Sequence, residues 1–357
     1  MPPDFPENYR AARKGFVAAC REAGLDVVSR VHPSALGPDG KPLFLDAAAI
    51  GPREAQKALL LISGTHGVEG HFGSGVQAGL LREGLTLPPG ARIVLLHALN
   101  PFGFAWSRRV NEDNIDINRN FVDHAKPPVN AAYDGLKNAI APRDISPRAM
   151  RAADAQLEAY AKSRGASALQ EALTRGQYHH PQGLFFGGQR ESWSSQMLRA
   201  VLREDLARVK KLIVVDFHTG LGRSGAAEMS IDDPPGSPAF ARCREIWGAA
   251  ALSSATGQSL SAALTGTIGL GLRGWLENVE LTSAVLEVGT RPVPQVLRAL
   301  RRDNWLHNFA DANQAAARGP AIARDMRAAF YCDRPTWKRA VWGHAKRAVT
   351  AALAALA

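Results

Sequence analysis

The feature that most constrains this chain is a continuous apolar run that ends in a glycine-rich loop. Residues 58–63 have the length and unbroken hydrophobicity of a strand buried in a parallel sheet. The three glycines of the loop 64–70 break the strand, and the pattern over 72–81 predicts a helix. The loop contains His66 and Glu69. Open α/β sheets bind ligands at the carboxyl ends of their strands, so we expect these two side chains to face a ligand site.

Further apolar runs extend this pattern along the chain. Residues 92–99, 212–217 and 279–288 also predict buried strands, while 25–31 and 43–46 flank a turn and predict a hairpin. Apolar residues at helical spacing predict helices over 8–23, 72–81, 146–163, 166–175, 192–209 and within 294–330. The alternation of strands and helices favours an α/β fold whose parallel strands are joined by crossover helices.

Composition excludes several classes of protein. The chain has 357 residues, of which 46% are hydrophobic, and this is enough to bury a large core. Its 43 basic and 33 acidic residues give a net charge of +10, but no block of like charges or basic–aromatic patch points to a nucleic acid. The three cysteines lack the spacing of a disulfide framework or thiolate metal site.

The organisation of the chain predicts a soluble, cytoplasmic protein. No basic segment leads into an apolar stretch near residue 1, and no apolar run approaches the roughly 20 residues that span a bilayer, so we expect no membrane contact. No repeat or long linker divides the sequence. We therefore expect one catalytic domain over 1–336, with 337–357 as an amphipathic helix packed on it or extending it. The oligomeric state is left open.

Polar residues end the predicted strands or lie in the loops that follow them. His218 follows the run 212–217, and Glu287 lies near the end of 279–288. Together with His66 and Glu69, His218 completes the two-histidine, one-glutamate ligand set of catalytic zinc sites. Glu287 is then a free carboxylate for general acid–base catalysis.

A long polar segment, 107–121, supplies arginines to the same edge of the predicted sheet. It contains Arg109 and the pair Asn118-Arg119. Arginines in such a crevice can stabilise an oxyanion or hold a carboxylate through two hydrogen bonds. Loops of this length inside a domain are uncommon unless they are functional.

The order of these residues resembles that of the zinc carboxypeptidase (funnelin-like) superfamily. Residues 109–121 are similar to the family segment R-x-N-x-x-G-V-D-L-N-R-N-F, and the resemblance covers roughly residues 55–300. It is closest to a bacterial branch without an assigned substrate, related to the succinylglutamate desuccinylase and aspartoacylase side. The resemblance implies a three-layer α/β/α fold with a mixed, largely parallel central sheet.

The resemblance also implies a role for each residue of the site. His66, Glu69 and His218 would bind one zinc ion, and Glu287 would be the general base and acid. Arg109 would stabilise the oxyanion. The carboxylate of the scissile residue would be held by Asn118 and Arg119.

Three points stay open at this level. Arg108 lies beside Arg109, and the sequence does not indicate which of them faces the site. Asp216 either orients a metal ligand or caps a helix. The family tyrosine that precedes the catalytic glutamate has no counterpart between His218 and Glu287. Tyr178, in the glycine- and aromatic-rich loop 176–188, is a candidate replacement that would contact the substrate.

These observations predict a zinc hydrolase that cleaves an amide bond beside a free carboxylate, by a metallocarboxypeptidase-type mechanism. Its substrate would be a small or modified peptide. The alternative is an N-acyl-amino-acid deacylase of the aspartoacylase or desuccinylase type. A third possibility, a non-catalytic binding protein, predicts loss of a ligand residue or of Glu287, and the sequence retains them all.

Overall fold

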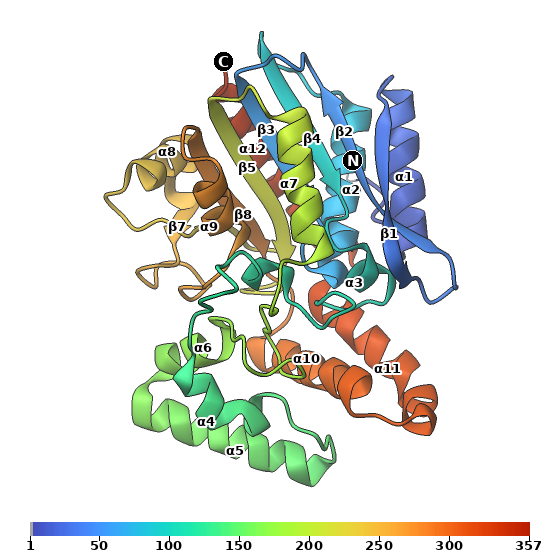
Figure 1. Ribbon diagram of the computed structural model, residues 1–357, viewed down its shortest axis with the longest axis vertical. Coiled ribbons are helices and arrows are strands. Elements are labelled where there is room, and N and C mark those ends of the chain that lie inside the picture. The colour runs from blue at the N-terminus through green and yellow to red at the C-terminus, as the bar shows by residue number, and fades with distance from the viewer. Residues whose placement is uncertain (1–2) are drawn as a thin grey trace.

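One eight-stranded sheet organises the computed structural model, which describes residues 3–357 (Figure 1). Its strand order is β1-β2-β4-β3-β5-β8-β6-β7. The strands are β1 (Val27–Leu36), β2 (Pro42–Ile50), β3 (Lys57–Ser63), β4 (Ala91–His97), β5 (Lys211–Thr219), β6 (Ala227–Ile231), β7 (Ala251–Ser253) and β8 (Glu280–Val288).

The central strands β4, β3, β5 and β8 are parallel to one another. On one side, β2 pairs antiparallel with β4 and forms a hairpin with β1. On the other side, β6 pairs antiparallel with β8. The predicted hairpin is confirmed, as is the α/β fold with a mixed, largely parallel sheet.

Helices cover both faces of this sheet. The helices are α1 (Tyr9–Glu22), α2 (Gly70–Glu83), α3 (Pro101–Ala105), α4 (Ala131–Ile140), α5 (Pro147–Arg164), α6 (Ala166–Thr174), α7 (Trp193–Asp205), α8 (Pro238–Trp247), α9 (Ile268–Trp275), α10 (Val293–Asn308), α11 (Ala312–Phe330) and α12 (Pro335–Ala354). One face packs against α1, α2, α8 and α12, and the opposite face packs against α7 and α9 (Figure 1).

The unbroken hydrophobicity of β3 follows from this arrangement. Successive side chains of a strand point to opposite faces, so a strand between two helical layers is apolar at every position. Leu59 and Leu61 belong to the core on the α2 side, while Leu60 and Ile62 belong to the core on the α7 side. The prediction of a doubly covered strand is therefore confirmed.

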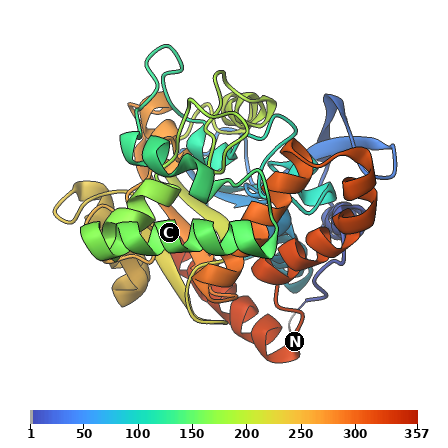
Figure 2. The same ribbon diagram turned by 90° about the horizontal axis from the view of Figure 1, so that it is seen from below.

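A further group of helices lies beyond the carboxyl ends of the central strands. Figures 1 and 2 show α4, α5, α6, α10 and α11 gathered at this end of the sheet. Buried apolar side chains of these five helices pack together there, and Phe185 packs with them. We call these five helices the cap. They cover the edge at which the sequence predicts a ligand site.

The region 224–278 contains most of the elements that the sequence did not predict. It forms β6, α8, β7 and α9. Its two strands are short and lie at the end of the sheet, so they lack a long apolar run. By contrast, the expected C-terminal helix is α12, and its buried face joins the core on the α2 side.

The last residues of the chain are held by two lysines of the sheet. Lys57 donates a hydrogen bond to the carbonyl of Leu356, and Lys211 donates to the carbonyl of Ala355. Within residues 3–357, no helix combines the length and apolar character needed to cross a membrane.

Candidate metal centre

The loop after β3 brings His66 and Glu69 together. β3 ends at Ser63, and a single 3-10 turn over Gly67–Glu69 leads into α2. This turn returns the Glu69 carboxylate to the imidazole, with His66 Nδ1 2.9 Å from Glu69 Oε1. Both side chains are buried.

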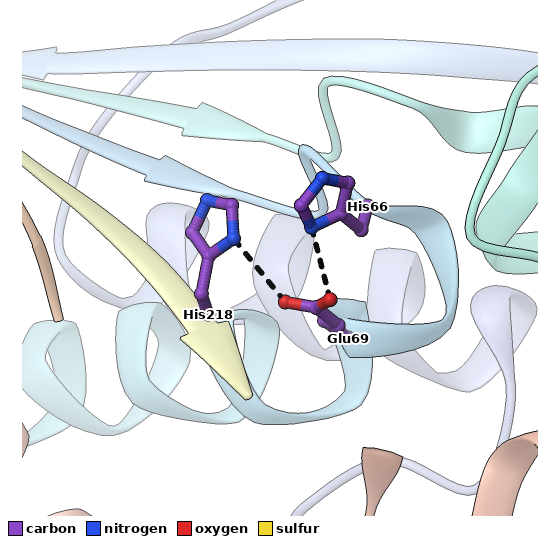
Figure 3. Close-up of side chains that lie close together, drawn as sticks. All are labelled: His66, Glu69 and His218. Atoms are coloured by element: carbon purple, nitrogen blue, oxygen red, sulfur yellow. Dashed lines mark hydrogen bonds and ion pairs between the residues drawn. The ribbon is translucent and has the colours of Figure 1, made fainter. Parts of the chain in front are cut away.

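His218 reaches the same point because of strand register. β3 and β5 pair in parallel with Ser63 beside Phe217, so the loop after β3 passes the end of β5. His218 Nδ1 lies 3.4 Å from Glu69 Oε2, and the two imidazole rings are 4.7 Å apart. One ligand atom each from His66, Glu69 and His218 lies within 4.8 Å of the other two (Figure 3).

A carboxylate faces the far nitrogen of each histidine. His66 Nε2 lies 3.1 Å from Asp116 Oδ1, and His218 Nε2 lies 2.7 Å from Asp216 Oδ2. Metal-binding histidines are typically oriented in this way, because the outer carboxylate fixes the ring and the tautomer. The Nδ1 atom of each histidine therefore faces Glu69. Two imidazole nitrogens and one carboxylate arranged so fit a zinc ion.

Asp216 belongs to this arrangement rather than to a helix cap. Residues two apart on a strand share one face, which places Asp216 beside His218. The hydroxyl of Thr65 donates to the Asp216 carboxylate at 2.9 Å. The loop that carries His66 therefore also positions the carboxylate behind His218.

The charges of the centre stabilise one another against the cost of burial. Burial lowers the pKa of His218, but the charge and hydrogen bond of Asp216 outweigh it and raise that pKa to about 9. Burial opposes ionisation of Asp116, yet Arg109 and His66 hold its pKa well below the usual range. For Glu69, the charge of His66 likewise overcomes burial and lowers the pKa.

Glu287 lies next to His218 because β5 and β8 pair in parallel with these two residues in register. Its Oε1 accepts a hydrogen bond from the backbone N–H of Leu221 at 2.9 Å. Burial, reinforced by the charge of Glu69, raises the pKa of Glu287 to about 8. Glu287 is thus a buried carboxylate beside the three candidate ligands, with an affinity for protons suited to acid–base chemistry.

Of the two adjacent arginines, Arg109 faces the centre. Its Nη1 lies 3.2 Å from Glu69 Oε1, and its Nε donates to Asp116 Oδ2 at 2.9 Å. Arg108 points elsewhere and forms a buried ion pair with Asp303. Arg109 therefore contacts the candidate metal centre, and Arg108 does not.

Asn118 and Arg119 line the same cavity as the metal centre. The amide oxygen of Asn118 accepts from the N–H of Ile268 at 2.9 Å. The Arg119 guanidinium donates from Nε and Nη2 to the carbonyl of Thr174, the last residue of α6. Its Nη1 donates to the carbonyl of Asn118 at 2.8 Å, so two of the five N–H donors of the guanidinium are left for a ligand while its position is fixed.

Tyr178 lies behind Arg119 rather than among the residues that line the cavity. Its hydroxyl donates to the carbonyl of Arg119 at 2.8 Å. The neighbouring His180 pairs with Asp134 on α4. Tyr178 thus supports the arginine from outside the cavity, whereas Phe185 of the same loop lines it.

The cavity at the centre has a volume of about 420 Å³. Its polar lining includes Ser230, Asp232 and Ser283 besides the residues above, and also Gln170 and Thr174 of α6. Its remaining lining is largely apolar and comes partly from α6, α10 and α11 of the cap and partly from loops, α9 and β8. A cavity of this volume lies within the usual range of small-molecule sites.

The sequence did not single out Asp116 and Thr65. Asp116 lies two residues before Asn118, within the segment that resembles the family motif, so the sequence could have indicated it as a site residue. Thr65 had none, because its role depends on the side-by-side packing of β3 and β5.

Several solved structures resemble this chain. A protein from Shewanella denitrificans OS-217, provisionally named a carboxypeptidase A, is 13% identical with a TM-score of 0.48, and the match covers 98% of this chain and 69% of that one. The carboxypeptidase A from Helicoverpa armigera is 11% identical with a TM-score of 0.43, covering 91% and 74%. An aspartoacylase family protein from Mesorhizobium loti is 15% identical with a TM-score of 0.37, covering 79% and 66%.

None of these TM-scores reaches 0.5, so the function proposed below rests on the geometry of the site. No curated protein matches the chain. Residues 5–344, which contain every side chain of the metal centre, match the family described as Protein of unknown function (DUF2817), and the chain belongs to that family.

Proposed function

We propose that this protein is a zinc-dependent hydrolase that cleaves an amide bond adjacent to a free carboxylate. The observation that carries the proposal is the convergence of His66, Glu69 and His218, each histidine backed by a carboxylate. A further carboxylate, Glu287, and a guanidinium, Arg109, stand beside this set. A purely structural metal site would need neither of them.

His66, Glu69 and His218 would hold the zinc ion. Bound there, zinc would polarise the scissile carbonyl and lower the pKa of a water molecule to about 7. Glu287 would accept the proton of the attacking water and return it to the leaving amine. The raised pKa of Glu287 supports this role, because an effective acid–base group titrates near the working pH.

Arg109 and the Asn118-Arg119 pair would provide the remaining charge. Negative charge develops on the carbonyl oxygen in the transition state, and a positioned guanidinium such as that of Arg109 stabilises it. Arg119 lines the cavity and would hold the substrate carboxylate, with help from the amide of Asn118. These are the roles that the sequence resemblance implies.

The experiment compares substrates with and without the free carboxylate. The zinc-loaded protein is assayed against N-acyl amino acids and short peptides of the common amino acids, and against the same compounds as C-terminal amides. We expect kcat/KM for the acids to exceed that for the amides by at least about a hundredfold. The amides would lose the ion pair between the substrate carboxylate and Arg119. Equal rates on acids and amides would contradict the proposed carboxylate site.

A further inference from the structure

The cap supplies one wall of the cavity, and this wall is apolar. α6 contributes Leu169 and Leu173, and α10 contributes Val296, Leu297 and Leu300. The loop 260–264 adds further leucines, and Phe330 ends α11 beside Gly220. We call this the acyl wall. Among its described residues no side chain is charged, whereas the charged groups of the cavity come from the strand ends and from the loops that follow the strands.

The apolar surface continues outward at the mouth of the cavity. Leu260 and Val293 both line it, yet their exposed fractions are 48% and 56%. They are among the few large hydrophobic side chains that the described residues leave exposed. These side chains extend the apolar surface that the cavity would offer to a ligand.

Three polar side chains of the acyl wall already donate hydrogen bonds to carbonyls within the wall. The side-chain N–H of Gln170 donates to the carbonyl of Leu260 at 2.6 Å. The hydroxyl of Thr174 donates to the carbonyl of Gln170, and that of Ser261 donates to the carbonyl of Ala262. A peptide backbone laid against the leucine and valine side chains of α6 and α10 would lose its hydrogen bonds to water without replacing them, at a cost of about 1–3 kcal/mol per group. An aliphatic chain has no such cost.

The acyl wall adjoins Glu287 and Arg109, the residues proposed to act on the scissile carbonyl, and would therefore hold the group on the carbonyl side of the bond. Phe330 lies against Gly220, and Glu287 accepts a hydrogen bond from the next residue, Leu221. Arg109 lies over Phe185, which belongs to the same apolar cluster as the cap. Arg119 lies over the same ring, and together with Asn118 and the polar residues Ser230, Asp232 and Ser283 it would face the amino-acid part of the substrate.

We infer that the substrate is an N-acyl amino acid whose acyl group is a medium-length aliphatic chain seated on the acyl wall. This inference rests on the proposed hydrolase function and names its substrate class. Hydrolysis adds the hydroxyl of water to the acyl carbonyl, breaks the C–N bond and transfers a proton to the amine. The products are an alkanoic acid and a free amino acid.

The test varies the acyl chain on a fixed amino acid. For each common amino acid, kcat/KM of the zinc-loaded protein is measured with acetyl, butanoyl and octanoyl derivatives, and with a dipeptide that has leucine in the acyl position. We expect affinity and kcat/KM to rise about fourfold per methylene, until the wall is filled. The octanoyl compound should therefore exceed the acetyl compound by at least about a hundredfold. A dipeptide as good as the octanoyl compound, or no dependence on chain length, would overturn the inference.

Variants of the wall test the position of the chain. Leu297→Asn should lower the octanoyl-to-acetyl ratio by about tenfold or more, because a polar group enters the apolar surface. Val293→Ser, at a position exposed enough to leave folding unaffected, should lower it by a smaller factor. The control is Val129→Ser, which changes an equally exposed valine outside the cavity and should leave the ratio unchanged. A ratio unchanged in both wall variants would refute the acyl wall.

Binding to Glu287→Gln separates this inference from the proposed function. Calorimetry with the acetyl and octanoyl compounds should show affinity that rises with chain length, even without turnover. If the wild type hydrolyses none of the compounds but Glu287→Gln still binds them in this order, the hydrolase proposal fails and the acyl wall stands. Hydrolysis without any dependence on chain length would instead support the hydrolase and refute the acyl wall.

Discussion

At the scale of single residues, the centre depends on pairing each histidine with a carboxylate. His66 and His218 are buried and would lose solvation in either protonation state. Asp116 and Asp216 compensate for this loss and fix which ring nitrogen faces Glu69. Asp116 and Asp216 would thus orient the two histidines as metal ligands, the usual role of an outer carboxylate.

Glu287 provides the sharpest prediction at this scale. Glu287→Gln keeps the size of the side chain but removes the proton acceptor, so we expect unchanged zinc content and a fall in kcat of at least about a hundredfold. Glu280→Gln, on the exposed opposite end of β8, is the matched control and should keep full activity. An active Glu287→Gln enzyme would remove Glu287 from the mechanism.

At the scale of elements, the loop after β3 is shaped by its contact with α3. A Cβ added to Gly67 would lie 2.0 Å from the carbonyl carbon of Gly103, far inside contact distance. Only glycine lets this turn approach α3 so closely. The 3-10 turn also sets the relative position of His66 and Glu69.

This contact predicts that Gly67→Ala displaces the turn and weakens zinc binding by at least about tenfold, the effect typical of disturbing the support of a metal ligand. Competition with a chromophoric chelator measures the affinity. Gly135→Ala in α4 is the control, because its Cβ meets nothing within 4 Å and should leave zinc affinity unchanged. Wild-type affinity in Gly67→Ala would show that the turn tolerates a shift.

The elements also show how far the sequence can predict this protein. The central strands were readable because burial on both faces makes them apolar throughout, and α/β topology then brings their carboxyl ends together. β6 and β7 were missed because short strands at the end of the sheet carry no such run. The choice between Arg108 and Arg109 needed the position of Asp303 on α10, which adjacent residues cannot reveal.

At the scale of the whole molecule, buried histidines outside the centre couple folding to pH. Burial lowers the pKa of His71 and of His97 to about 4 in each case. In the unfolded chain a histidine has a pKa of about 6.5. Between these values the unfolded state binds more protons than the folded state, so stability is full above about pH 6.5 and falls as the pH drops toward 4.

His97 allows this coupling to be measured. His97 Nε2 lies 2.9 Å from the hydroxyl oxygen of Ser74, a contact that glutamine can replace. We expect the loss of unfolding free energy between about pH 7.5 and pH 5 to be smaller by about 2 kcal/mol in His97→Gln than in the wild type. Denaturant titrations at both pH values give the difference, and equal losses would show that His97 is protonated in the folded protein.

The central claim is that His66, Glu69 and His218 bind zinc, and elemental analysis tests it most directly. Wild-type protein, His218→Ala and the control His97→Gln are exposed to zinc, dialysed together and analysed for metal. We predict about one zinc ion per chain in the wild type and the control, and a large loss in His218→Ala, which lacks one ligand. Metal-free wild-type protein, or equal zinc in His218→Ala, would contradict the claim.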